Sequence, residues 1–251
     1  MSLIIKKNTT FKIPRTSPLL IGLLAYWKLD NNGSGEVSLV DSSGNSRTLT
    51  APNGTSGLFL GSGVINGSAQ FTGGLSTYLS RSGTFLNGTR DAYSISAWVK
   101  TILEEDLFIV DQATGNNYGG SSIGLQMLPN GRIHGSIFWG TDDGEGNIFY
   151  DRATGTTAIN NGNFNHVAMT WLRTGSIKVY VNGVLNGSSD SSGNYANVPT
   201  ENFSLNSNAD GSFAVGKDCN IDEVGVWNKE LSASEITSLY NAGAGKTYPF
   251  N

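Results

Sequence analysis

The chain has 251 residues, of which 33 are glycine and only 14% are charged. Its 16 basic and 20 acidic residues give a formal net charge of -4, which excludes a nucleic-acid footprint over the whole surface. The single cysteine, Cys219, excludes an intramolecular disulfide framework, and no apolar run approaches the roughly 20 residues of a membrane-spanning helix. This composition favours one all-β domain of short strands and tight turns, with Cys219 buried as a small apolar side chain.

The N-terminal stretch differs from the rest of the chain. It contains four basic residues, Lys6, Lys7, Lys12 and Arg15. No acidic residue occurs before Asp30. Pro14 and Pro18 interrupt any regular element, so residues 1–21 are predicted to form an extended basic arm and residues 22–251 a globular domain. The stretch also lacks the long apolar region of a signal peptide. We expect the arm to contact other structural subunits.

From residue 23 onward, apolar residues alternate with polar ones in short runs bounded by Gly, Asn and Pro. The absence of helical patterns between these runs predicts an antiparallel sandwich. Besides a hairpin at residues 165–185, the expected strands are 23–29, 69–71, 78–80, 92–100, 107–111, 122–128, 132–139, 203–205, 213–216 and 220–227.

The hairpin at residues 165–185 has the plainest pattern. Two alternating runs follow one another, and Asn182-Gly183 supplies the two positive-φ positions of a type I′ turn. We expect Trp171, Val179 and Val181 to face the core, and His166, at the start of the first run, to be structural.

One helix is predicted near the C-terminus. Ser232 and Glu235 form an S-x-x-E capping box, and Gly243 is placed to end the helix. Ile236, Leu239 and Tyr240 share one face, which is expected to cover an edge or open end of the sandwich.

Several motifs, taken in order, resemble the laminin-G-like domains of the concanavalin A-like lectin and glucanase superfamily. They are GLLAYWKLD at 22–30, DSSGN at 41–45, AQFTG at 69–73, YSISAWVK at 93–100, HVAMTW at 166–171, KVYVNGVL at 178–185, IDEVGVW at 221–227 and LSASEITSLYN at 231–241. The resemblance implies a jelly roll of two antiparallel sheets with the helix packed beside it. The basic arm is outside this pattern.

Catalysis is not expected. Glucanases of this superfamily place paired carboxylates on one face, whereas Asp222 and Glu223 are adjacent on a predicted strand and should point to opposite faces. The only histidines are His134 and His166, which makes a histidine-based zinc site improbable, and no nucleophile motif is present. A ligand-facing position of His134, on the strand after the turn at 129–131, stays open.

Calcium is the ion that the oxygen-rich loops favour. One candidate set is Asp41 and Asn45, joined by Asp222 if the first loop lies beside the last strand; similar domains often carry a structural calcium there. The second set, in the acidic loop, is Asp142, Asp143 and Glu145 with Asn147. The first stretch is equally an Asx turn, and the second is equally a solvated hairpin tip.

A glycan-binding surface requires exposed aromatic rings flanked by polar side chains. The candidates in or beside Gly- and Asn-rich stretches are Tyr118, Trp139, Phe149, Tyr150 and Tyr195. By contrast, Trp27, Trp98, Trp171 and Trp227 occupy strand positions and are expected in the core.

The sequence therefore predicts a non-enzymatic recognition or attachment module for glycans or another cell-surface ligand. With its arm, it would suit a component of a larger assembly, such as a phage or virus surface or tail protein on a virion or extracellular surface, and a homo-oligomer would add multivalency. The alternatives are a purely structural decoration protein and, less favoured, a glycan hydrolase.

Overall fold

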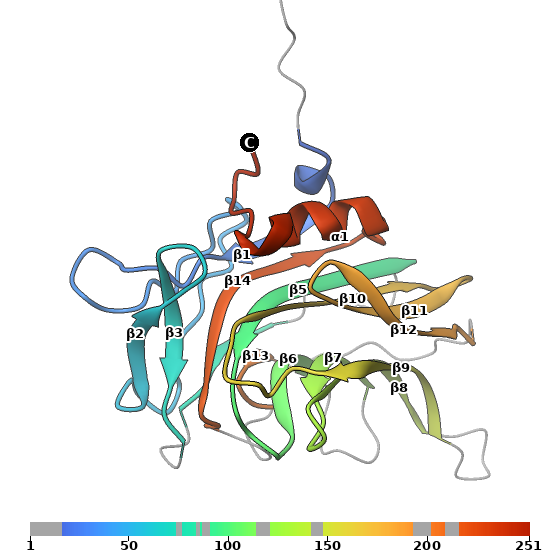
Figure 1. Ribbon diagram of the computed structural model, residues 1–251, viewed down its shortest axis with the longest axis horizontal. Coiled ribbons are helices and arrows are strands. Elements are labelled where there is room, and N and C mark those ends of the chain that lie inside the picture. The colour runs from blue at the N-terminus through green and yellow to red at the C-terminus, as the bar shows by residue number, and fades with distance from the viewer. Residues whose placement is uncertain are drawn as a thin grey trace, which may run out of the picture.

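The computed structural model describes residues 17–73, 77–83, 86, 91–113, 121–141, 148–192, 202–208 and 216–251, with the backbone alone at 121, 139–141, 148 and 149. Two antiparallel sheets stack face to face, as Figure 1 shows. The eight-stranded sheet has the order β12-β11-β10-β5-β14-β3-β2, with β1 paired to β14, and the six-stranded sheet has the order β4-β13-β6-β7-β8-β9. This is the predicted all-β sandwich.

The eight-stranded sheet consists of β1 (Leu23–Trp27), β2 (Leu58–Ser62), β3 (Gly67–Phe71), β5 (Ala92–Lys100), β10 (Asn165–Leu172), β11 (Ser176–Val181), β12 (Val184–Asp190) and β14 (Cys219–Trp227). The six-stranded sheet consists of β4 (Leu79–Arg81), β6 (Leu107–Ala113), β7 (Ser121–Met127), β8 (Arg132–Thr141), β9 (Ile148–Ala158) and β13 (Phe203–Leu205). Within each sheet, all of these strand pairings are antiparallel.

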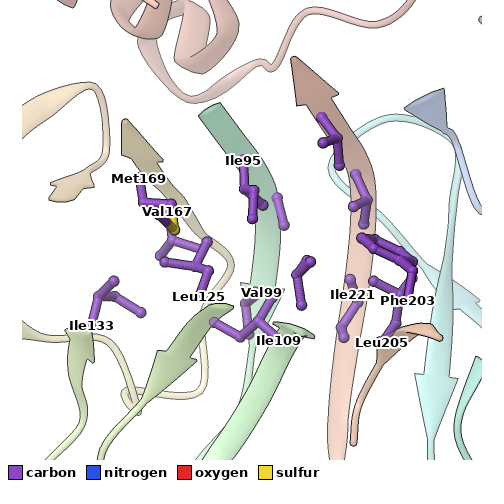
Figure 2. Close-up of a cluster of buried hydrophobic side chains, with 14 of the residues drawn as sticks. Ile95, Val99, Ile109, Leu125, Ile133, Val167, Met169, Phe203, Leu205 and Ile221 are labelled. Atoms are coloured by element: carbon purple, nitrogen blue, oxygen red, sulfur yellow. The ribbon is translucent and has the colours of Figure 1, made fainter. Parts of the chain in front are cut away.

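The core fills the space between the two sheets. Figure 2 shows Ile95, Val167 and Ile221 of the eight-stranded sheet facing Ile109, Leu125 and Ile133 of the six-stranded sheet. The predicted core residues Trp171, Val179 and Val181 belong to this cluster, and Cys219 is a buried member of it. All four tryptophans expected in the core are buried: Trp27, Trp98, Trp171 and Trp227.

Strand β8 of the six-stranded sheet passes close to β10 and β11 of the other sheet. A Cβ atom added to Gly135 would lie 2.9 Å from Val179 Cγ1 and 3.1 Å from Met169 Cβ, so only glycine fits this position. At the sheet edges, Asn186 of β12 accepts hydrogen bonds from the backbone N–H groups of Thr156 (2.8 Å) and Thr157 (3.0 Å) in β9. These contacts close one side of the sandwich.

The predicted hairpin is confirmed. Strands β10 and β11 pair with Val167 opposite Val181 and Trp171 opposite Ile177. Asn182 (φ 50°) and Gly183 (φ 79°) hold the two positive-φ positions that the turn requires. His166 is buried, with Nε2 2.9 Å from Ser96 Oγ, as a structural residue would be.

The helix α1 (Ala233–Tyr240) begins with the predicted capping box, in which Ser232 Oγ accepts from Glu235 N–H and Glu235 accepts from Ser232 N–H. Its position differs from the prediction. Instead of covering an edge, its buried residues pack on the outer face of the eight-stranded sheet, on the side away from the six-stranded sheet (Figure 1). This second cluster exists because Tyr26, Ala168 and Trp227 point outward from their strands.

Both described ends of the chain join this outer layer. The short 3-10 turns η1 (Pro18–Leu20) and η2 (Asn241–Gly243) flank it, Leu19 is buried, and Trp227 Nε1 donates to the Leu19 carbonyl oxygen at 2.7 Å. Residues 1–16, which form most of the predicted arm, lie outside the described residues. None of the described helices is long and apolar enough to cross a membrane.

Two strands were absent from the prediction, β2 and β9. In β9, the inward positions are Asp151, Ala153 and Gly155, so the strand shows no apolar alternation. The strand expected at 213–216 falls almost wholly outside the described residues.

Candidate functional site

The outer face of the six-stranded sheet carries a band of polar and aromatic side chains across three neighbouring strands. Register places these residues in three rows: Ser122, Phe138 and Tyr150; Gly124, Ser136 and Arg152; and Gln126, His134 and Thr154. We call these nine residues the β7–β9 face. Their neighbours along each strand, such as Leu125, Ile137 and Ala153, point into the core, which forces this set outward.

Tyr150 and Arg152 are both exposed on the β7–β9 face. Tyr150 is 42% exposed, and the Arg152 guanidinium carbon lies 4.4 Å from the centroid of its ring. They stand two residues apart on β9 and therefore point the same way. Phe138, half-buried, lies opposite Tyr150 on β8. A ring face, an apolar wall and a guanidinium are thus presented together.

His134 is the imidazole of this face. Its Nδ1 lies 2.9 Å from Thr154 Oγ1, its cross-strand partner. Burial, and secondarily the charge of Arg152, lower the pKa of His134 to about 4. The ring is therefore neutral at physiological pH and offers one donor and one acceptor nitrogen.

Gly124 makes the centre of the face shallow. It lies between Asp111 of β6 and Ser136 of β8, and an added Cβ atom would meet Asp111 Oδ1 at 3.0 Å. Asp111 is buried, with 4% exposure. In the described rows across β6 to β9 on this face, Asp111 is the sole carboxylate.

The predicted ligand-binding aromatics are placed unevenly. Tyr150 lies on the β7–β9 face, and the backbones of Trp139 and Phe149 belong to β8 and β9. Tyr118 and Tyr195 lie outside the described residues. The structure thus brings one predicted side chain onto this surface.

The side chains of Asp41 and Asn45 are both hydrogen-bonded to nearby backbone groups. Asp41 Oδ1 accepts from the N–H groups of Tyr26 (3.1 Å) and Ser43 (2.9 Å), and Oδ2 accepts from Arg47 N–H (2.9 Å). Although burial opposes the effect, these hydrogen bonds lower the pKa of the Asp41 carboxyl. Asn45 donates its amide to the Leu24 carbonyl oxygen at 2.9 Å. The Asx-turn interpretation fits this geometry, and the oxygens of Asp41 already face N–H donors.

The Asp222 carboxylate binds a different loop, the one that contains Val64 and Ile65. Its Oδ2 accepts from Val64 N–H (2.8 Å) and Ile65 N–H (3.3 Å), whereas Oδ1 has no hydrogen-bond partner among the described residues. The structure therefore does not join it with Asp41 and Asn45 through a shared contact. Among the described residues, no group of three His, Cys, Asp or Glu side chains could hold a metal ion, and Asp142, Asp143, Glu145 and Asn147 fall outside them.

The expectation that Asp222 and Glu223 point to opposite faces is wrong. A β-bulge interrupts β14 between Asp222 and Gly225, and Glu223 has a φ of 50°. Both carboxyl groups therefore leave the strand on its outer side, where Glu223 accepts a hydrogen bond from the Tyr26 hydroxyl. Burial raises the pKa of both groups, and their proximity raises that of Asp222 further. With 0% and 3% exposure, this pair is closed to a sugar.

A second hollow lies at the edge of the eight-stranded sheet. A groove of about 500 Å³ runs between β2 and the segment 32–40. Phe59 (51% exposed) and Val40 (59% exposed) form its apolar part. It contains one described aromatic ring and one acidic residue, Glu36, so it offers less polar recognition than the β7–β9 face.

Sequence reasoning missed Arg152, Ser136, Gln126 and Thr154. The signal that could have found Arg152 and Thr154 is the run D-R-A-T-G-T-T-A at 151–158, in which small residues alternate with long or hydroxylated ones. Small inward side chains weaken the apolar alternation that identifies a strand.

A family model described as the concanavalin A-like lectin/glucanases superfamily, of the laminin-G-like type, matches residues 72–237. No curated protein matches the chain.

Solved structures share the fold. The binding domain of Paraclostridial mosquitocidal protein 1 matches with a TM-score of 0.65 at 14% identity, over 90% of this chain and 53% of its own. The binding domain of botulinum neurotoxin DC in complex with SialylT matches with 0.64 at 13%, over 89% and 52%. The ligand-binding domain of botulinum neurotoxin serotype D in complex with N-acetylneuraminic acid matches with 0.65 at 14%, over 89% and 51%. The chain therefore spans about half the length of these structures.

Proposed function

Because this chain belongs to the laminin-G-like group of the concanavalin A-like lectin/glucanases superfamily, we propose that it is a non-enzymatic recognition module that binds glycans on the β7–β9 face. The observation that carries the proposal is the exposed Tyr150 ring beside Arg152, Ser136 and His134 on one sheet face. Sugars are recognised by rings that stack on their apolar faces and by polar groups that bond their hydroxyls. Structures of similar fold include complexes with a sialyl ligand and with N-acetylneuraminic acid.

The absence of enzymatic activity is part of the proposal. Glycosidases of either stereochemistry use two carboxyl groups flanking the scissile bond. The described rows of the face supply Asp111 alone, and the pair at Asp222 and Glu223 is buried on the other sheet. A hydrolase would instead release reducing sugar and lose activity on Asp222→Asn or Glu223→Gln.

A glycan array with fluorescently labelled protein tests the binding site. Tyr150→Ala removes the stacking ring, and we expect the affinity for any bound glycan to fall about tenfold, equivalent to about 1.4 kcal/mol. Phe59→Ala is the matched control, since it removes another exposed ring on the other sheet. Loss of binding in Phe59→Ala alone would move the site to the β2 groove. Wild-type protein that binds no glycan would favour the purely structural alternative.

We also propose that the module works within a larger assembly, such as a phage or virus surface or tail, and is anchored by its basic arm. Deletion of residues 1–16 tests this, because Leu19 is buried and its carbonyl accepts from Trp227, so a longer deletion would damage the domain. We expect the shortened protein to fold and to bind glycan as before while losing incorporation into the assembly or the homo-oligomer. Unchanged assembly would contradict anchoring by the arm.

Calcium binding stays a prediction. Its test is the melting temperature with added Ca²⁺ and with EDTA, since an ion that binds only the folded state raises stability. An unchanged melting temperature in both conditions would argue against a structural calcium.

A further inference from the structure

We propose that the ligand of the β7–β9 face is an acidic glycan, whose carboxylate Arg152 binds. This inference rests on the proposed function and names the class of sugar. Arg152 is exposed, and the Tyr150 ring lies against its guanidinium, with the guanidinium carbon 4.4 Å from the ring centroid. An arginine held against an aromatic face loses less side-chain freedom when it binds, and its fork of N–H donors matches a carboxylate.

Among the described residues, no carboxylate is paired with the Arg152 guanidinium. None of the salt bridges formed by described residues involves Arg152. Its sequence neighbour Asp151 points inward, where it accepts from Trp171 Nε1 at 3.2 Å. Asp111, in the same row, lies three strands away, beyond Ser136 and Gly124, and is buried. A ligand anion would therefore supply a countercharge that the described residues do not supply to Arg152.

Arg152 is also the sole charged residue among the nine of this face at physiological pH. His134 would be the other cation, but its pKa of about 4 keeps it neutral, and the charge of Arg152 contributes to that shift. The remaining polar members, such as Ser136, Gln126 and Thr154, donate to and accept from neutral hydroxyls. The face thus combines one anion-binding point with hydroxyl recognition.

The arrangement around Arg152 has the form of a sugar subsite. Tyr150 and Phe138 sit opposite each other across β9 and β8, and Arg152 and Ser136 form the next cross-strand pair. Cross-strand partners on one face lie about 5 Å apart, so a ring over the aromatic pair can reach the Arg152 row with a carboxylate substituent. Uronic acids and sialic acids both carry such a group.

Matched pairs of oligosaccharides test the inference by titration calorimetry. Sialyllactose is compared with lactose, and oligogalacturonate with its methyl ester. We expect the wild type to bind an acid at least about tenfold more tightly than its neutral partner, with an affinity that falls as salt rises. Binding of sialyllactose would identify a sialic acid as the source of the carboxylate, and binding of oligogalacturonate would identify a uronic acid.

The variants Arg152→Gln and Arg152→Lys assign the preference. Arg152→Gln should bring the affinity for the acidic sugar down to that for its neutral partner in the same variant, whereas Arg152→Lys should retain part of the preference. Arg152 is exposed, so an unchanged melting temperature of both variants is the check on folding. A preference for acid that survives Arg152→Gln would overturn the role of Arg152. Equal binding of acidic and neutral sugars, lost in Tyr150→Ala, would overturn the inference alone, and no binding of any sugar would overturn the proposed function with it.

Discussion

Asp41 and Asp222 are two buried carboxyl groups whose surroundings act in opposite directions. Three backbone N–H groups stabilise the ionised form of Asp41. Asp222 receives two such bonds on one oxygen, while its other oxygen has no described partner and Glu223 lies beside it. The pKa is lowered at Asp41 and raised at Asp222. Each group therefore links folding to pH with its own sign.

In the Asp222→Asn variant, the free energy of unfolding is expected to fall less steeply as pH rises than in the wild type. The folded state keeps the Asp222 proton after the unfolded chain has lost it, so the stabilisation is complete below about pH 4 and disappears as pH rises through the raised folded pKa. Removing this group should flatten the slope of unfolding free energy above pH 4 by up to about 1.4 kcal/mol per pH unit. Urea unfolding at a series of pH values measures it.

Asp41→Asn is the matched control with the reverse sign. Its lowered pKa means that the stabilisation is present above about pH 4 and is lost as pH falls through the folded pKa. The variant should be less stable near neutral pH, by about 1–3 kcal/mol for three weakened N–H bonds, and less sensitive to acid. Parallel pH profiles for both variants would contradict this assignment.

Glu223 shows why this region could not be predicted from the sequence. Alternation along a regular strand sends adjacent residues to opposite faces, and that rule failed because the bulge gives Glu223 a left-handed φ. A non-glycine residue in this conformation leaves no signal in local composition. By contrast, Trp171 and Val179 obey the alternation, and their burial was predictable.

At the level of elements, the turn between β11 and β12 is expected to depend on Gly183. An alanine there would adopt a φ of 79° and place its Cβ atom 3.0 Å from the Tyr240 ring. The conformation alone costs about 1–2 kcal/mol, and displacing Tyr240 adds to it. Gly33→Ala is the control, since Gly33 has a φ of 92° and no atom near the added Cβ. Chemical denaturation should rank Gly183→Ala as the less stable variant, and equal losses would show that the contact with Tyr240 contributes nothing.

The capping box of α1 is expected to contribute to the stability of the outer layer. Ser232→Ala removes the acceptor of Glu235 N–H and should cost about 1 kcal/mol in unfolding free energy. Ser238→Ala, within the same helix, replaces serine by a better helix former and should cost nothing. Thermal unfolding followed by circular dichroism compares the two. A Ser232→Ala variant as stable as the wild type would indicate that the cap is replaced by water.

Element prediction was accurate for β5 and β13, whose inward residues are apolar, and failed for β9, whose inward residues are not all apolar. β5 and β13 have the predicted bounds. β9 was not predicted because its inward positions include Ala153 and Gly155. Arg152, the centre of the proposed subsite, was therefore not predicted either. The site depends on register between β7, β8 and β9, and a local pattern does not specify which residues stand opposite each other.

At the scale of the molecule, the eight-stranded sheet is shared by two apolar layers. Its inner face contributes Val167 and Met169 to the core between the sheets, and Ala168 of the same strand belongs to the outer cluster under α1. The same alternation occurs in β14, where Val226 points inward and Trp227 outward. The outer layer therefore rests on strands that the inner core holds in place.

This sharing predicts that the two layers unfold together. Leu125→Ala in the inner core and Ile236→Ala in α1 each remove a fully buried side chain and should each cost about 2–5 kcal/mol. Since β10 and β14 serve both layers, each variant should lower the temperature of one common transition. Differential scanning calorimetry measures the number of transitions, and the summed fluorescence of the five tryptophans, which include Trp227 of the outer layer and Trp171 of the inner core, gives an independent unfolding curve. A separate low-temperature transition in Ile236→Ala would show instead that α1 and its cluster form an independent cooperative unit.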